Sequence, residues 1–80
     1  MNFLMSANEQ DEMLDNRFTY HAPFGDQPQR YEQVRAAAKE LAHVIQTLSP
    51  QSREQSVALT KLDEVVFWTN AGIARNEKQS

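Results

Sequence analysis

Two stretches of the chain repeat hydrophobic or small residues at alternating spacings of three and four. The members are Tyr31, Val34, Ala38, Leu41, Ile45 and Leu48 in the first stretch, and Leu59, Leu62, Val66, Thr69 and Ile73 in the second. Such spacing aligns the residues of each stretch along one side of an α-helix. The sequence therefore predicts two long helices, over residues 27–47 and residues 53–75.

Start signals precede both predicted helices. Asp26 followed by Gln29 resembles a capping box at the start of the first helix. The second helix has two candidate starts, which are Ser49 followed by proline and Ser52 followed by Gln55. With either start the connection is short, and short connections join antiparallel helices. The sequence therefore predicts an antiparallel helical hairpin.

The segments outside the hairpin are shorter. Residues 1–17 form an N-terminal segment, in which we expect a short amphipathic helix from residue 8 to residue 17. We expect residues 18–26 to form an extended loop with aromatic residues and proline, and the polar residues 76–80 to fray. A chain of 80 residues makes at most one domain. The predicted fold class is therefore a single all-α domain.

Residues 65–68, with the sequence Val-Val-Phe-Trp, are hydrophobic around most of the circumference of the second helix. Consecutive helical residues point about 100° apart, so one partner helix can cover only one stripe of this run. Either the N-terminal segment folds back over the remainder, or a second copy of the chain covers it, as small domains often require. We favour the second arrangement and predict a homo-oligomer.

The composition excludes several classes of function. The net charge is −3, with 8 basic and 11 acidic residues, which disfavours binding to nucleic acid polymers or anionic membranes. The chain has no cysteine, which excludes disulfide bonds, thiolate catalysis and the usual zinc knuckles. Its start does not resemble a signal peptide, and no stretch reaches the roughly 20 apolar residues of a membrane-spanning helix. We therefore expect a soluble, cytoplasmic protein.

The sequence also carries no motif of a catalytic or cofactor site. His21 and His43 are the two histidines, and neither has an acidic residue at a metal-ligand spacing. Gly25 and Gly72 are isolated, so they do not form a phosphate-binding loop. A nucleophile elbow is not present either. We therefore expect no enzyme activity, no metal and no cofactor.

Residues 18–27, FTYHAPFGDQ, concentrate aromatic side chains just ahead of the first long helix. An extended backbone places Phe18, Tyr20 and Phe24 on one side of the segment. These side chains either cover the end of the hairpin or form a stacking surface for a flat ligand such as a purine base. The residues by themselves leave both interpretations open.

A family resemblance lies in two stretches, TYHAPFGDQPQRYEQVR and SPQSREQSVALTKLDEVVFWTNAGIARNE. They resemble small phage proteins of the anti-CBASS sponge family, whose helical hairpin is shared with the Thoeris anti-defence sponges. The resemblance covers about residues 18–77. It implies a non-enzymatic protein that binds cyclic nucleotide second messengers in the cytoplasm of the infected bacterial host and keeps them from the defence effector. It also implies compact homo-hexamers that bind cyclic dinucleotides between protomers and, in some members, cyclic trinucleotides at separate sites.

The resemblance further implies roles for individual residues. Tyr20 matches a tyrosine that stacks on a base, Arg35 a basic residue that pairs with the cyclic phosphate, and Arg75 an arginine that meets trinucleotide phosphates. Phe24 stands where many relatives have lysine, which favours stacking over charge pairing. The expected ligand-binding residues are Tyr20, His21, Pro23, Phe24, Arg35, Asn70 and Arg75. The alternative function is a phage interaction or structural module that binds another protein through the hairpin.

Overall fold

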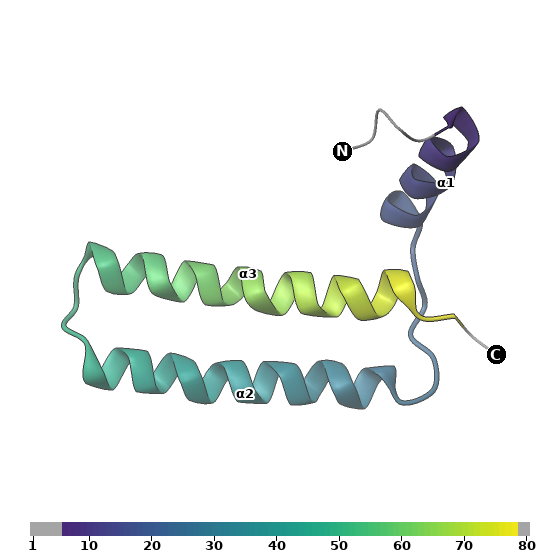
Figure 1. The fold of residues 1–80 in the computed structure, drawn as a ribbon. Helices are drawn as coiled ribbons and strands as arrows, with labels where there is room; N and C mark the ends of the chain where they lie inside the picture. Colours follow the sequence, from purple (N-terminus) through teal and green to yellow (C-terminus); the bar gives the residue numbers. More distant parts are fainter. Residues whose placement is uncertain (1–5, 79–80) are drawn as a thin grey trace.

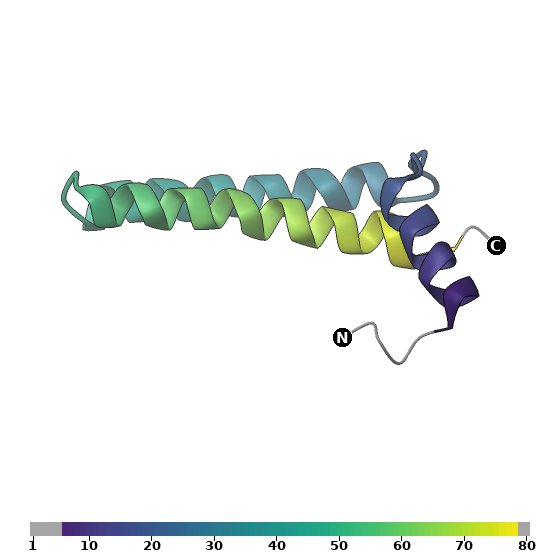
Figure 2. The same cartoon turned by 90° about the horizontal axis from the view of Figure 1, so that it is seen from above.

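A computed structural model describes residues 6–78, and these residues form three helices and no strand. The helices are α1 (Ala7–Phe18), α2 (Gln27–Leu48) and α3 (Arg53–Asn76). Figure 1 shows α2 and α3 side by side and antiparallel, and Figure 2 shows the same pair from above. Helix α1 projects from the open end of the hairpin, where α2 begins and α3 ends (Figure 1). The predicted all-α fold with a helical hairpin is therefore confirmed.

The turn of the hairpin, residues 49–52, is held by side chains at the two helix ends. Ser52 caps α3, because its backbone is extended and its Oγ accepts a hydrogen bond from the amide of Gln55 at 3.1 Å. Gln55 Nε2 donates to the carbonyl oxygen of Ser49 at 3.0 Å. Ser49 follows the last residue of α2 as its C-cap, and its amide donates to the carbonyl of Ile45. Of the two candidate starts of α3, Ser52 is therefore the observed one.

The start of α2 differs from the predicted capping box. Asp26 precedes the helix, but its side chain accepts no capping hydrogen bond from a backbone amide of the first turn. A side-chain cap needs an extended backbone at this position, whereas Asp26 has φ −92° and ψ 9°. Its carboxylate instead accepts a hydrogen bond from Arg30 Nε at 3.1 Å. The prediction of a capping box from Asp26 and Gln29 is therefore wrong.

The stripe along which the two long helices face each other departs from the alternating pattern of the sequence. Leu41 is 48% exposed, and its neighbour Ala42 is half-buried in its place. Thr69 is exposed in the same way, and Asn70 is half-buried. A repeat of 3.5 residues falls behind the roughly 3.6 residues per turn of a straight helix, so the facing stripe moves by one position along the helix. The placement of Leu41 and Thr69 on the facing stripe is therefore wrong.

Gln27 is the only buried side chain among residues 6–78, with 2% of its surface exposed. Its Nε2 donates to Glu77 Oε1 at 3.1 Å and to the carbonyl oxygen of Ile73 at 3.4 Å. Its Oε1 accepts a hydrogen bond from the amide of Phe24 at 3.2 Å. No hydrophobic side chain in the described range is buried. The most enclosed contacts at the open end of the hairpin are therefore polar.

Arg30 completes a polar junction that consists of Gln27, Arg30 and Glu77. Two guanidinium nitrogens of Arg30 lie 2.7 and 2.5 Å from the carboxylate oxygens of Glu77. The hydrogen bond from Arg30, followed by the one from Gln27, lowers the pKa of Glu77 from 4.5 to about 2. The expected fraying of residues 76–80 is wrong at its start, because Asn76 is the last residue of α3 and Glu77 is held against α2.

Helix α1 leaves the hydrophobic surface of α3 uncovered. Its own apolar residues Leu14 and Phe18 are 45% and 76% exposed. On α3, Val65, Phe67 and Trp68 are 56%, 66% and 68% exposed. Within residues 6–78, the N-terminal segment therefore does not fold back over the hydrophobic run of α3. Residues 1–5, the remainder of that segment, lie outside the described residues.

Candidate functional site

The loop between α1 and α2 carries four of the residues expected to bind ligand. Tyr20 is 82% exposed, Pro23 is exposed, and His21 and Phe24 are half-buried. The loop is turned into α2 by Gly25, whose φ of 58° lies in the region that glycine adopts without strain. The aromatic ring of Tyr20 is thus available for stacking at the open end of the hairpin.

His21 has a structural contact in this loop. Its Nε2 lies 2.6 Å from the carbonyl oxygen of Asn16, to which it donates a hydrogen bond. The last four carbonyl groups of a helix have no partner within the helix, so this bond satisfies one of them at the end of α1. His21 therefore fixes the direction in which the chain leaves α1, and through it the position of Tyr20.

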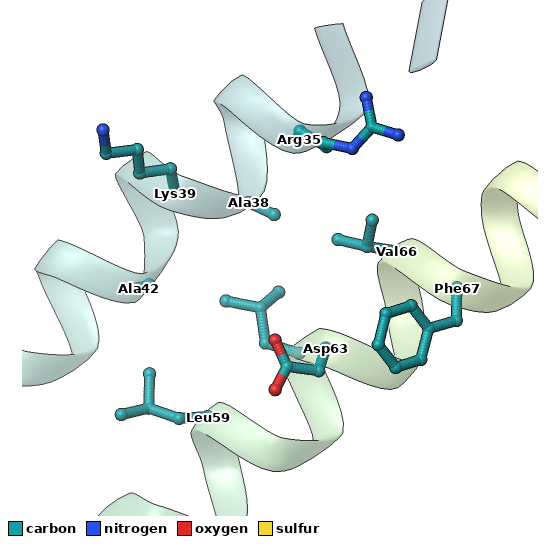
Figure 3. Close-up of a pocket in the computed structure, with 9 residues that line it drawn as sticks. Arg35, Ala38, Lys39, Ala42, Leu59, Asp63, Val66 and Phe67 are labelled. Carbon is teal, nitrogen blue, oxygen red and sulfur yellow. The ribbon is translucent and has the colours of Figure 1, made fainter. Parts of the chain in front are cut away.

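A groove of about 350 Å³ runs between α2 and α3 and contains Arg35 (Figure 3). Arg35 and Lys39 line it from α2, and Asp63 and Phe67 line it from α3. Small and aliphatic side chains form its floor, and these are Ala38, Ala42, Leu59, Leu62 and Val66. We call it the interhelical groove. Its rim thus combines two cations, one carboxylate and one aromatic ring.

Arg35 is partly neutralised within its own helix. Its Nη1 lies 2.5 Å from the carboxylate of Glu32, and 54% of the Arg35 side chain is exposed. An exposed pair of this kind contributes little to stability, because both charges remain solvated. The guanidinium therefore keeps free N–H donors toward solvent, which an anionic ligand can use.

A second groove, of about 420 Å³, lies on α3 toward the open end. It is lined by Glu64, Phe67, Trp68, Ala71 and Arg75. We call it the α3 groove. It places a guanidinium group and two exposed aromatic rings on the same helix face. A cation beside stacking surfaces is the combination that phosphates and bases require of a binding site.

Arg75 also connects α3 to α1. Its Nη2 donates to the carbonyl oxygen of Arg17 at 3.3 Å. Arg17 lies in the last turn of α1, where carbonyl groups lack helical partners. The position of Arg75 in the last turn of α3 also suits its charge, because the helix dipole is negative at that end. Arg75 therefore has structural contacts in addition to its place in the α3 groove.

Asn70 lies on the side of α3 that faces α2. It is half-buried, and its Oδ1 is buried without a hydrogen-bond partner among residues 6–78. A buried oxygen without a partner is costly in a folded chain. Asn70 lines neither the interhelical groove nor the α3 groove.

The seven expected ligand-binding residues therefore separate into four places within one chain, one of which is the position of Asn70 outside both grooves. Tyr20, His21, Pro23 and Phe24 lie in the loop, and none of them lines either groove. Arg35 and Arg75 lie in different grooves, which share only the ring of Phe67. The sequence did not point to Lys39 and Asp63 as groove residues, and it indicated Phe67 only as part of a contact between copies. The available signal was spacing by four, since Lys39 follows Arg35 by one turn and Phe67 follows Asp63 by one turn.

The described residues contain no group of three or more His, Cys, Asp or Glu side chains that could hold a metal ion. None of the helices in residues 6–78 combines the length and the apolar character that crossing a membrane requires.

A protein-family model matches most of the chain. A family model described as the Acb2/Tad1 hairpin domain matches residues 10–74, which extend from within α1 almost to the end of α3. No curated protein and no solved structure matches the chain. The matched range includes the loop, both grooves except Arg75, and the whole of α2.

Proposed function

The chain belongs to the Acb2/Tad1 hairpin family, the family of the anti-CBASS and Thoeris sponges, and on this premise we propose that it sequesters cyclic oligonucleotide second messengers. It holds these anions without cleaving them and so withholds them from the effector of a bacterial anti-phage defence. The place of action is the cytoplasm of the infected host. The observation that carries the proposal is the family match over residues 10–74.

The two grooves support this proposal through their chemistry. Each combines a guanidinium group with at least one exposed aromatic ring. Arginine donates charge-assisted hydrogen bonds to phosphate, and aromatic rings stack on bases of any kind. The groove volumes of about 350 and 420 Å³ fall in the range of roughly 300–1,000 Å³ that small-molecule sites occupy.

We assign Tyr20 and Arg35 to a cyclic dinucleotide site, together with His21, Pro23 and Phe24 of the loop. Because Tyr20 does not line the groove of Arg35 within one chain, this site brings the loop of one copy to the interhelical groove of another. We assign Arg75 to a distinct cyclic trinucleotide site, and Asn70 remains an expected ligand-binding residue that is assigned to neither site. The assembly that forms both sites is a homo-oligomer, and by family resemblance a hexamer.

A thermal screen tests the proposed function. A ligand that binds only the folded state raises the melting temperature, so micromolar cyclic di- or trinucleotide is expected to raise it by several degrees. Heat denaturation of the complex is then expected to release the cyclic nucleotide intact, as chromatography can verify. Recovery of linear nucleotides would instead identify the protein as a nuclease.

A second candidate function is a module that binds another protein through the hairpin. The observation that favours it is the exposed hydrophobic run of α3, in which Phe67 and Trp68 are 66% and 68% exposed. The same thermal screen separates the two functions. A protein-binding module gains no stability from any cyclic nucleotide, whereas a nucleotide-binding protein does.

A further inference from the structure

Two residues of opposite charge line the interhelical groove from its two helices without pairing. Lys39 lines it from α2 and Asp63 lines it from α3. Within residues 6–78, neither side chain forms a hydrogen bond or an ion pair. Elsewhere on the hairpin such charges do pair, as Arg30 of α2 does with Glu77, the residue that follows α3. Lys39 and Asp63 therefore both keep their full hydrogen-bonding capacity for a third group that enters the groove.

A site for phosphate alone would not contain Asp63. A carboxylate repels phosphate and, when ionised, can only accept hydrogen bonds. The group that lies against Asp63 must therefore present N–H or O–H donors, while another part of the same ligand carries negative charge toward Lys39 and Arg35. A nucleotide has both parts, since its base offers donors and its phosphate is anionic.

Guanine and adenine differ in the hydrogen-bond donors and acceptors that they present to a carboxylate. The Watson–Crick edge of guanine presents two neighbouring donors, N1–H and the N2 amino group, which match the two oxygens of a carboxylate. The same edge of adenine presents one amino donor next to the N1 acceptor, which a carboxylate repels. The ring of Phe67, 66% exposed beside Asp63 (Figure 3), offers a stacking surface for either base.

We propose that the interhelical groove reads guanine: Asp63 accepts hydrogen bonds from the guanine edge, Phe67 stacks on the base, and Lys39 with Arg35 meets the phosphate. This inference rests on the proposed function and deepens it by naming the base and two further binding residues. Asp63 sets the base preference, and Lys39 contributes affinity that is independent of the base.

Calorimetry of the full chain with a matched set of ligands tests this inference. The probes are cyclic di-GMP, cyclic di-AMP and the inosine counterpart of cyclic di-GMP, which lacks the N2 amino group. Unsubstituted protein is expected to bind the guanine ligand most tightly. A bidentate contact to a base edge gives discrimination of about five- to a hundred-fold. Asp63→Asn is therefore expected to weaken guanine binding by that factor. It is not expected to weaken adenine binding, because an amide does not repel the N1 acceptor of adenine.

Two further variants act as controls. Glu40→Gln removes one negative charge beside Lys39, from an exposed position that does not line the groove. It is expected to leave the guanine preference unchanged, which separates a contact from a long-range charge effect. Lys39→Gln is expected to weaken all three ligands by a similar factor and to reduce the dependence of their affinities on salt.

The possible failures are distinguishable. If the unsubstituted protein binds none of the cyclic nucleotides, both the proposed function and this inference are wrong. If it binds them but Asp63→Asn changes guanine and adenine binding equally, or changes neither, the inference is wrong and the proposed function stands. Light scattering covers the remaining case. A changed oligomer mass in Asp63→Asn or Lys39→Gln, without a changed base preference, would show that these side chains act through assembly rather than by contacting the ligand, and would overturn the inference.

Discussion

The ion pair between Arg30 and Glu77 joins single residues that lie at the two ends of the hairpin sequence. Its hydrogen bonds lower the pKa of Glu77 from 4.5 to about 2. A carboxyl group whose pKa is lower in the folded state stabilises the fold fully above its ordinary pKa. That contribution is lost as the pH falls through the folded-state value. For Glu77 the loss therefore falls between pH 4.5 and about pH 2.

Replacing Glu77 gives a pH-dependent prediction. Glu77→Gln removes the charge that pairs with Arg30, so the variant is expected to melt at a lower temperature than the unsubstituted protein at pH 6. This difference should shrink as the pH falls from 4.5 toward 2, because Glu77 becomes protonated. Circular dichroism melts over this range measure it, with Glu40→Gln as an exposed control. A difference that stays constant across the range would contradict the assignment.

Residues of the proposed ligand sites give a second prediction at this scale. Base stacking on an aromatic ring contributes about 1–3 kcal/mol. Tyr20→Ala is therefore expected to weaken cyclic dinucleotide binding by roughly ten- to a hundred-fold and to leave trinucleotide binding nearly unchanged. Arg75→Ala is expected to do the reverse, because a hydrogen bond to phosphate is charge-assisted. Calorimetry of both variants against both ligands measures this.

The controls for these variants follow from the contacts of Arg75. Its side chain also donates to the Arg17 carbonyl, so Arg75→Ala can loosen α1 as well as remove a ligand contact. The melting temperature without ligand separates the two effects. If either Tyr20→Ala or Arg75→Ala abolishes binding of both ligands while the oligomer stays intact, the protein has one site rather than two.

At the scale of the helices, residue spacing predicts that the hairpin forms but not how its helices face each other. Both predicted stripes lie on helices of the structure. On the side where α2 and α3 face each other, however, Ala42 takes the position expected for Leu41, and Asn70 the position expected for Thr69. This shift depends on how far each straight helix rotates along its partner, which the sequence pattern does not encode.

The helix starts and the candidate site were likewise predicted only in part from the sequence. The pattern of a polar residue followed three positions later by glutamine occurs at Asp26 and at Ser52, and only Ser52 forms the cap, because only its backbone is extended. The expected ligand residues came from family resemblance. The opposition of Lys39 and Asp63 depends on which helix faces meet, so the sequence alone did not predict it.

The cap of α3 gives a prediction at this scale. Ser52 Oγ accepts a hydrogen bond from the amide of Gln55, and its loss leaves that amide without a helical partner. Ser52→Ala is therefore expected to lower the free energy of unfolding by about 0.5–2 kcal/mol. Ser56→Ala, at an exposed position inside the helix, is the matched control and should have little effect. Equal effects of the two substitutions in urea unfolding would show that Ser52 is not the cap.

For the whole molecule, the main feature is a hairpin without a buried hydrophobic side chain among residues 6–78. Chains of this length bury a modest fraction of their surface when they fold alone, and many reach stability by association. Phe67 belongs to both grooves and is 66% exposed. The surface available for contact between copies therefore overlaps the surface proposed for ligands, which couples assembly to binding.

Assembly can be tested directly. If copies meet through the exposed run of α3, the protein is expected to be a multimer in light scattering at micromolar concentration. Phe67→Glu and Val65→Glu each place a charge in that contact and are expected to dissociate the multimer or prevent folding. Gln51→Glu, which adds the same charge at an exposed position in the turn, is expected to leave the mass unchanged. A folded monomer of the unsubstituted chain would contradict the prediction.

Side-chain hydrogen bonds close the hairpin at both ends, and the bonded residues are separated by very different lengths of chain. Gln55 and Ser49 are 6 residues apart in sequence, whereas Gln27 and Glu77 are 50 apart. Closing a longer loop loses more chain entropy, so contacts between near neighbours form sooner. We therefore expect the contacts between α2 and α3 to form first beside the turn and last at the open end. The loop that carries Tyr20 then takes its final position last in each newly synthesised chain.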